Sequence, residues 1–289
     1  MFQKIISLKF VLIGCAAFFF FTCMDYVVKE LTTKYSIFQI IFFLNFTNFI
    51  ILSLIVLKQG KHLIKTKNYK LHLVRGILNI IVSTTVIYSF SKLDISLVYS
   101  IIFTAPIFSS LLGHFFLKEY ITRIKLLAVL IGLTGVMFIL RPGVTEFDLT
   151  YLLAVISAIF SSINNLLMRR SGKNENPLSF TYYSSILMSV VFFLTSLSDF
   201  RIPDLHDLVL IIISGALMST AAYCIILAFV NLPIYLVGVL QYSQLIWSML
   251  IGVLIFNHIP GLYSLVGVTL IIIGGGVSAG GKYFRLKWL

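Results

Sequence analysis

The sequence predicts an all-α integral membrane protein with ten transmembrane helices, arranged as two inverted halves of five helices each. The composition, the spacing of the apolar runs and an internal repeat lead to this prediction. Of the 289 residues, 59% are hydrophobic and only 11% are charged. Soluble domains are about 45–50% apolar and about 25% charged, so this chain has more apolar side chains than a water-soluble fold can bury.

Apolar runs long enough to cross a bilayer recur along the chain. A transmembrane helix needs about 20 mostly apolar residues, and backbone amides in hydrocarbon must be hydrogen-bonded within the segment, so each run is expected to be helical. The first run is too long for a signal peptide and has no small-residue cleavage site before its polar end. The predicted spans are 8–28, 36–57, 71–91, 95–117, 122–140, 148–168, 178–197, 207–229, 233–256 and 261–279.

The basic residues predict the orientation of these spans. Seventeen of the 22 lysines and arginines fall in alternate connections, and five fall on the other side. Arg75, which opens the third span, is counted with the basic residues of the cytoplasmic connection before it. The positive-inside rule then places both termini in the cytoplasm. This distribution accounts for the net charge of +12 without a nucleic-acid partner, because no solvated segment is long enough to bind one.

An internal repeat appears when the chain is compared with itself at an offset of 139 residues. Leu93 then falls on Leu232, Gly113 on Gly252, and the register continues without gaps into the following span. An odd number of spans per half makes the second half start on the opposite side of the membrane. We therefore expect one transmembrane domain, 1–289, built from inverted repeats 1–143 and 144–289. Carriers that work by alternating access are often built this way, with their site near the midplane.

Several short motifs occur in each half. The first half contains Arg75-Gly76, the run Phe103-Thr104-Ala105-Pro106, and Leu140-Arg141-Pro142-Gly143; the second contains the run from Gln241 to Trp247. In these motifs the chain resembles the ten-helix, EamA-type branch of the drug/metabolite transporter superfamily. The second-half run is similar to a subgroup associated with S-adenosylmethionine or riboflavin uptake. The resemblance implies a multi-pass transporter of the bacterial inner membrane.

The chain also departs from the pattern of this family. Leu245 and His258 stand in the second repeat where the first has Pro106 and Glu119. Asn45 stands where many relatives carry an arginine. A mechanism that depends on those charged groups is therefore not expected here.

Polar and aromatic side chains inside the spans mark a candidate substrate path, because polar groups are costly in the hydrocarbon core. On the ninth span, Gln241 and Gln244 share one helical stripe, with Tyr242 and Trp247 on its flanks. The remaining candidates on other spans are Asn79, Tyr88, Tyr99, Phe103, Asn164, Asn165 and Tyr223. Together they predict a cavity for a ring-bearing, neutral or cationic metabolite. The alternative is a structural role, because interhelical hydrogen bonds between such residues are common in bundles.

Three further residues are interpreted one by one. Asp25 is the acid that lies clearly within a predicted span, so it can bind a proton or a cationic substrate, or it can reach the interface or pair with Lys29 one turn on. Pro106 predicts either a hinge or a plain kink. Glu119, close to basic neighbours, is expected to form a structural ion pair on the cytoplasmic side.

The sequence favours a secondary transporter over a membrane-embedded enzyme. The five histidines are scattered over different segments without an HExxH motif, and the three cysteines lack metal-ligand spacing. A GxxxxGK run at 276–282 ends a span and is followed by Tyr283 in place of Ser or Thr, so no ATP site is expected. We expect no catalytic residues, metal or cofactor. The expected partners are a small-molecule substrate and the lipid bilayer, with a homodimer left open; an exporter of amino acids or drugs is the alternative function.

Overall fold

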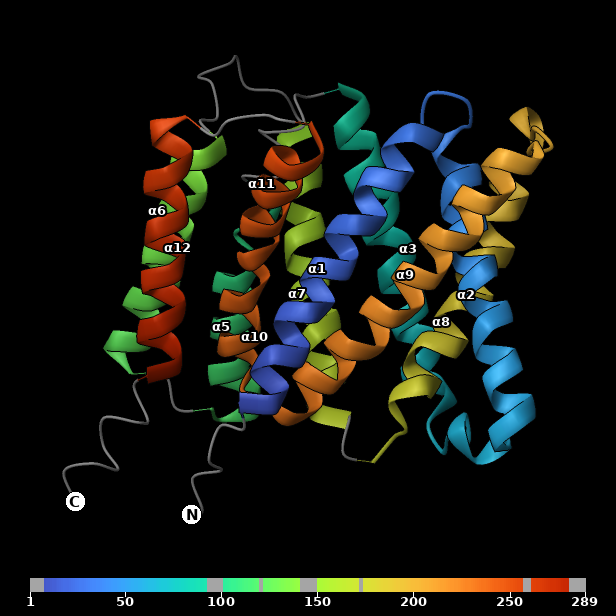
Figure 1. The fold of residues 1–289 in the computed structure, drawn as a ribbon. Helices are drawn as coiled ribbons and strands as arrows, with labels where there is room; N and C mark the ends of the chain where they lie inside the picture. Colours follow the sequence, from blue (N-terminus) through green and yellow to red (C-terminus); the bar gives the residue numbers. More distant parts are fainter. Residues whose placement is uncertain are drawn as a thin grey trace.

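The computed structural model describes residues 8–92, 101–119, 122–140, 150–171, 174–256 and 261–280, and in these ranges all regular structure is helical. The helices form one bundle, in which α6 and α12 lie side by side at one edge and α2 lies at the other (Figure 1). The α-helices are α1 (Leu8–Leu31), α2 (Ile37–Gln59), α3 (Tyr69–Lys92), α5 (Ala105–Leu117), α6 (Arg123–Leu140), α7 (Thr150–Ser171), α8 (Pro177–Ser196), α9 (Leu205–Asn231), α10 (Ile234–Gln241), α11 (Ser243–Phe256) and α12 (Leu262–Gly280).

Each apolar run predicted from the sequence overlaps an observed helix. Six candidate spans are long and apolar enough to cross a membrane, and α10 and α11 together make one of these. Shorter apolar helices occupy Ala105–Leu117, Leu126–Phe138 and Leu265–Gly274. The start of the expected fourth span, 93–100, lies outside the described residues. The prediction of an all-helical membrane protein is therefore confirmed.

Polar residues at the helix ends explain where several helices begin. The side chains of Ser36, Asn176 and Asp204 accept hydrogen bonds from backbone N–H groups in the first turns of α2, α8 and α9. The first N–H groups of a helix have no partner within the helix, so these caps favour a start at that residue. α8 also has Pro177 in its first turn, where the missing N–H costs nothing.

The predicted ninth span is not one continuous helix, which corrects the expectation of an unbroken stripe along it. α10 and α11 meet at Tyr242, whose backbone N–H donates to Val239 O at 3.1 Å. Leu245 N–H in turn donates to Tyr242 O at 3.2 Å. These bonds span three residues instead of four, so the helix tightens and changes direction there.

The fourth predicted span is interrupted in the same way. Residues 103 and 104 form a turn, and α5 starts directly after it with Pro106 in its first turn. The turn at Phe103 and the break at Tyr242 are 139 residues apart, which is the offset of the sequence repeat. Pro106 therefore lies at an interruption between helical segments, as the hinge interpretation requires.

Small residues allow α6 and α12 to pack with their backbones close together. A Cβ placed on Gly135 would lie 2.5 Å from Gly267 O, and a Cβ on Gly274 would lie 2.7 Å from Ala128 O. The two contacts are reciprocal, because Ala128 and Gly267, like Gly135 and Gly274, are 139 residues apart. The other extensive helix pairs are α1 with α9, α2 with α8, α3 with α7, and α5 with α10.

An ion pair ties the connection between α1 and α2 to the start of α9. Lys34 Nζ lies 2.8 Å from Asp207 Oδ1, and the Tyr35 hydroxyl donates to Asp207 Oδ2 at 2.7 Å. The Asp207 side chain is 3% exposed. The hydrogen bond to Asp207 raises the pKa of Lys34 above its ordinary value, so Lys34 stays charged over the whole neutral range.

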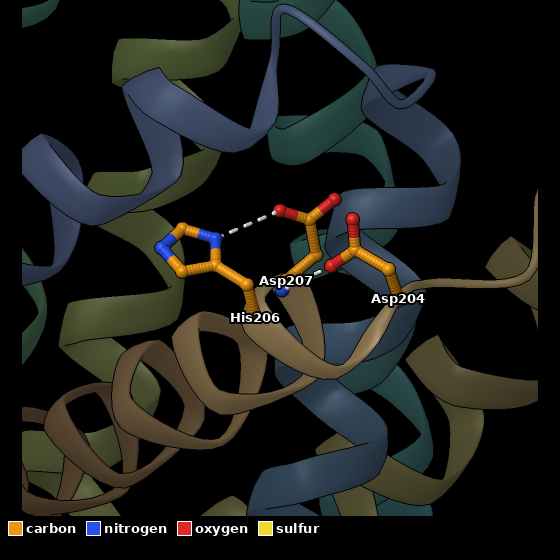
Figure 2. Close-up of side chains that lie close together, drawn as sticks. All are labelled: Asp204, His206 and Asp207. Atoms are coloured by element: carbon orange, nitrogen blue, oxygen red, sulfur yellow. Dashed lines mark hydrogen bonds and ion pairs between the residues drawn. The ribbon is translucent and has the colours of Figure 1, made fainter.

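Asp204, His206 and Asp207 lie together at this helix start, with potential ligand atoms within 4.8 Å of one another (Figure 2). Their hydrogen bonds give each acid a structural role. Asp204 Oδ1 accepts from Asp207 N–H at 2.8 Å as the cap of α9, and Asp207 Oδ1 already accepts from the Lys34 ammonium. A metal ion would have to displace this ammonium, so we interpret the cluster as a helix cap with an ion pair.

We expect Gly274→Ala to lower the free energy of unfolding by about 1–3 kcal/mol, the usual cost of forcing atoms into a packed interior. The new methyl group would meet backbone atoms of α6, at 2.7 Å from Ala128 O and 3.1 Å from Gly132 N, which cannot rotate away. Thermal unfolding in detergent measures the effect. Gly261→Ala is the control, because no atom of the described residues lies within 4 Å of its added Cβ. Equal melting temperatures for the two variants would contradict this packing.

We also expect Asp207→Ala to lower the melting temperature, because it removes the acceptor for Lys34 and Tyr35 together. Asp199→Ala, at an exposed acid of the same end of the bundle, should melt like the wild type. The contribution of the ion pair should fade as the pH rises above about 10.5, because the raised pKa of Lys34 makes the bound ammonium more stable than the free one. An Asp207→Ala variant as stable as Asp199→Ala would contradict the role of this contact.

Candidate functional site

A cavity of about 240 Å³, lined by both polar and apolar residues, lies inside the bundle. Residues of α2, α3, α7, α8 and α9 form most of its wall, and Phe21 of α1 contributes one side chain. Its polar lining residues are Asn45, Asn48, Arg75, Asn79, Ser83, Asn164, Thr181, Ser184 and Ser185. Its apolar lining residues are Phe21, Val82, Met168, Phe180, Met188, Met218, Ala222, Ile225 and Ile226.

Arg75 is the charged residue of this wall, and it corrects an expectation from the sequence. The basic-residue pattern placed Arg75 in a cytoplasmic connection, but α3 begins at Tyr69, so Arg75 lies well inside the helix. The residue is only 4% exposed. Its Nε donates to Asn164 Oδ1 at 2.8 Å and its Nη1 to Phe180 O at 3.2 Å. Its Cζ lies 4.6 Å from the centre of the Phe180 ring, a cation–π contact.

Asn164 and Asn79 extend this contact from α7 to α3. Asn164 Oδ1 accepts from Arg75, and Asn164 Nδ2 donates to Asn79 Oδ1. Because an amide has one accepting and one donating end, the two bonds together determine how the Asn164 side chain is oriented. Arg75 is in this way held by α7 and α8 and is turned toward the cavity that all three residues line.

Two asparagines of α2, Asn45 and Asn48, also line the cavity and are hydrogen-bonded. Ser219 of α9 donates to Asn48 Oδ1 at 2.8 Å, and Asn45 Nδ2 donates to Ile41 O at 2.9 Å. Ser184 of α8 differs from them, because its hydroxyl oxygen is buried and has no hydrogen-bond partner among the described residues. A buried hydroxyl without a partner is unfavourable, so Ser184 offers an unused polar group at the cavity wall.

The polar residues of the predicted ninth span lie elsewhere, against α1. Gln244 Nε2 donates to Asp25 Oδ2 at 3.0 Å. The Tyr26 hydroxyl donates to Ser248 O at 3.0 Å, and Thr22 Oγ1 approaches Gln244 O at 3.4 Å. The partner that the structure gives Asp25 is therefore Gln244, which joins α1 to α11. These residues are not part of the cavity wall.

The aromatic candidates also lie apart from the cavity. Tyr242 is completely buried and meets Phe103 edge to face at 6.3 Å, in an apolar cluster of α5, α6, α10 and α12. Trp247 packs against Phe19 at 5.4 Å. Tyr88 is 49% exposed and Tyr223 is 39% exposed.

Asn79 and Asn164 are the sequence-predicted candidates that the structure brings together at the cavity. Asn165 and Gln241 are partly buried but are not among its lining residues, and Tyr99 lies outside the described residues. The lining residues that sequence reasoning missed include Arg75, Asn48 and Ser184. For Arg75 a signal was present, because it falls within the predicted span 71–91, six residues after the start of α3 at Tyr69.

The comparison with known proteins agrees with this fold. A solved crystal structure superposes with a TM-score of 0.81 at 17% identity, covering 96% of this chain and 98% of the other. An S-adenosylmethionine uptake transporter of Rickettsia bellii is 27% identical over 86% of this chain and 85% of its own length. A riboflavin transporter of Vibrio cholerae is 25% identical over 60% of this chain and 59% of its own length. A pseudopaline exporter of Pseudomonas aeruginosa is 21% identical over 91% of this chain and 93% of its own length.

A family model matches the chain twice in succession. The model of the EamA-like transporter family matches residues 8–141 and again residues 148–278. The two matches cover nearly all of the helical bundle. The chain therefore belongs to the EamA-like transporter family.

Proposed function

We propose that this membrane protein is a secondary transporter that carries S-adenosylmethionine, or a similar ring-bearing metabolite, through the cavity by alternating access. The observation that carries the proposal is the cavity itself, which is buried in the bundle and has hydrogen-bonding groups on α2, α3, α7 and α8. Polar groups inside a membrane bundle are costly and usually mark a substrate path. The names of the relatives, which include importers of two ring-bearing metabolites, support the substrate class.

The proposed architecture is ten helices in two inverted repeats, 1–143 and 144–289, with both termini cytoplasmic. The helix pairing supports it, because counterparts at the 139-residue offset pair with each other: α2 with α8, and α6 with α12. The same offset relates α1 to α7 and α3 to α9. The pair of α1 with α9 therefore corresponds to the pair of α7 with α3. A twofold relation between halves predicts this pattern, and inverted repeats are a common construction of alternating-access carriers.

The two interrupted helices support a moving contact between the halves. A Cβ on Gly238 of α10 would lie 2.9 Å from Pro106 Cβ of α5, so the two segments cross in close contact. Discontinuous helices in corresponding positions of the two halves are typical of transporters. We propose that the halves rock about this crossing.

An ion-pair clamp, formed by Glu119 and Arg169, joins the two proposed halves at one end of the bundle. Arg169 Nε lies 2.9 Å from Glu119 Oε1, and Arg169 Nη1 also donates to Val230 O at 2.6 Å. Glu119 Oε2 accepts from Ile234 N–H at 3.0 Å, at the start of α10. Glu119 was expected to form an ion pair, and the structure shows that its partner is Arg169 of α7. We propose that this clamp closes the cytoplasmic end in one state of the cycle.

Export is the second candidate, because the pseudopaline exporter covers a larger share of this chain than the riboflavin transporter does. The same rocking motion serves either direction, and the gradient across the membrane decides which one occurs. Family and relatives name transporters, and among the described residues we find no grouping of a nucleophile with a base in the cavity wall that would favour an enzyme.

Uptake of radiolabelled S-adenosylmethionine into proteoliposomes tests the proposal, with riboflavin as competitor. We expect saturable uptake by the wild type. In Asn164→Ala we expect the uptake rate to fall about tenfold or more, because the variant loses the hydrogen bond from Arg75 at the cavity wall. A hydrogen bond to a charged group contributes about 1.5–3 kcal/mol. Thr220→Ala is the matched control, since its hydroxyl bonds to Ala216 O within α9 and is exposed on the outer face. Lack of uptake by folded wild-type protein under any gradient would contradict this substrate class.

The clamp is tested by a double-mutant cycle of Glu119→Gln and Arg169→Gln. We expect each change to lower the melting temperature, with a coupling of about 0.5–3 kcal/mol between them. We also expect the maximal uptake rate to change while KM stays near its wild-type value, because neither residue lines the cavity. Additive effects on stability, or an effect confined to KM, would argue against a clamp.

A further inference from the structure

We propose that Arg75 is an anion receptor in the cavity and that the transported metabolite presents a carboxylate to it. The inference rests on the proposed function and narrows the substrate class to amino acids and compounds with an amino-acid end. The sequence predicted a neutral or cationic compound. A zwitterion such as S-adenosylmethionine satisfies both expectations, because it combines a carboxylate with cationic groups.

The first argument is that the Arg75 charge lacks a counterion. Burying a charge is costly unless it is paired. The partners of Arg75 are an amide, a backbone carbonyl and an aromatic ring, all of which are neutral. Within the described ranges no carboxylate oxygen lies within 4 Å of its guanidinium. A negatively charged ligand would supply the missing charge.

Three acids of the described residues have partners elsewhere. Asp25 accepts from Gln244, Glu119 pairs with Arg169, and Asp207 pairs with Lys34. Glu175 is the remaining candidate for a counterion of Arg75, because its side chain is almost buried and it lies on the connection before α8. Its oxygen is 3.5 Å from His72 Nε2, one turn before Arg75 on α3, so its contact is with the imidazole.

The second argument is the set of hydrogen-bond donors on residues that line the cavity. A guanidinium carries five N–H donors in a rigid fork, and the two bonds found among the described residues account for two of them. Ser184 adds a hydroxyl; the residue is 7% exposed, and the hydroxyl has no partner in the described part of the chain. Ser184 follows Phe180 by one turn of α8, so its side chain lies on the helix face that holds Arg75. A carboxylate can accept from both groups at once.

The third argument is the size of the cavity. Pockets for whole drug-sized ligands usually measure about 300–1,000 Å³. At about 240 Å³, this cavity suits one end of such a molecule. The charged group lies at its wall together with Asn79 and Asn164, so the end that fits best is the polar one. Met168, Met188 and Met218 provide an adaptable apolar surface for the adjoining carbon chain.

The experiment compares a carboxylate-bearing ligand with its decarboxylated form, and it separates recognition from a structural role of Arg75. S-adenosylmethionine and decarboxylated S-adenosylmethionine share the adenosine and sulfonium groups. We expect the wild type to prefer the carboxylate form by about tenfold or more, as a charge-assisted bidentate contact allows. Arg75→Gln should lose this preference, and Arg75→Lys should retain part of it. Lys70→Gln, at an exposed position of α3, should keep the wild-type preference.

A purely structural Arg75 would change stability and all transport rates but would leave the ratio between the two ligands unchanged. Equal uptake of both forms by the wild type would overturn the inference and leave the proposed function intact. If the wild type carries neither form, the S-adenosylmethionine assignment fails. In that case the inference is tested by ligand-induced thermal stabilisation. The shift in melting temperature is compared between L-methionine and 3-(methylthio)propylamine, which lacks the carboxylate, and between other amino acids and their decarboxylated amines. Stabilisation that ignores the carboxylate in every pair would overturn it.

Discussion

The structure depends on one constraint: polar groups inside the bundle must find partners within the protein, because lipid offers none. Many serine and threonine side chains find a partner within their own helix. Ser162, for example, donates to Ala158 O at 2.7 Å. Two cavity-lining residues are exceptions: Arg75 has only neutral partners, and the Ser184 hydroxyl has no hydrogen-bond partner among the described residues. A ligand that binds in the cavity can therefore supply the partners that these two residues lack.

The backbone contacts explain how such a cavity coexists with a tightly packed bundle. At one edge α6 and α12 approach so closely that Gly135 and Gly274 leave no room for a side chain. In the middle, α5 and α10 cross at Pro106 and Gly238, beside the two helix breaks. The cavity is displaced from both contacts, between α2, α3, α7, α8 and α9. Dense packing on one side provides a rigid support, and the polar wall on the other side is the part that can change with a ligand.

The two halves share a framework but contribute different chemistry to the cavity. Asn79 and Ser83 of α3 correspond, at the offset of 139 residues, to Met218 and Ala222 of α9, and all four line the wall. At these two positions the first half provides an amide and a hydroxyl group, and the second half provides apolar surface. The symmetry of the fold therefore does not require symmetry of the site.

The sequence by itself determined the helical membrane class, the positions of the spans to within a few residues and the family, because apolar runs and repeated motifs are properties of local chain segments. It also identified Asn79 and Asn164. Only the tertiary structure decided that Gln244 faces Asp25, that Tyr242 is packed into an apolar cluster and that Arg75 enters the cavity. Helical spacing shows which residues share a face, but the neighbour on that face is set by how α1, α3, α7 and α11 pack.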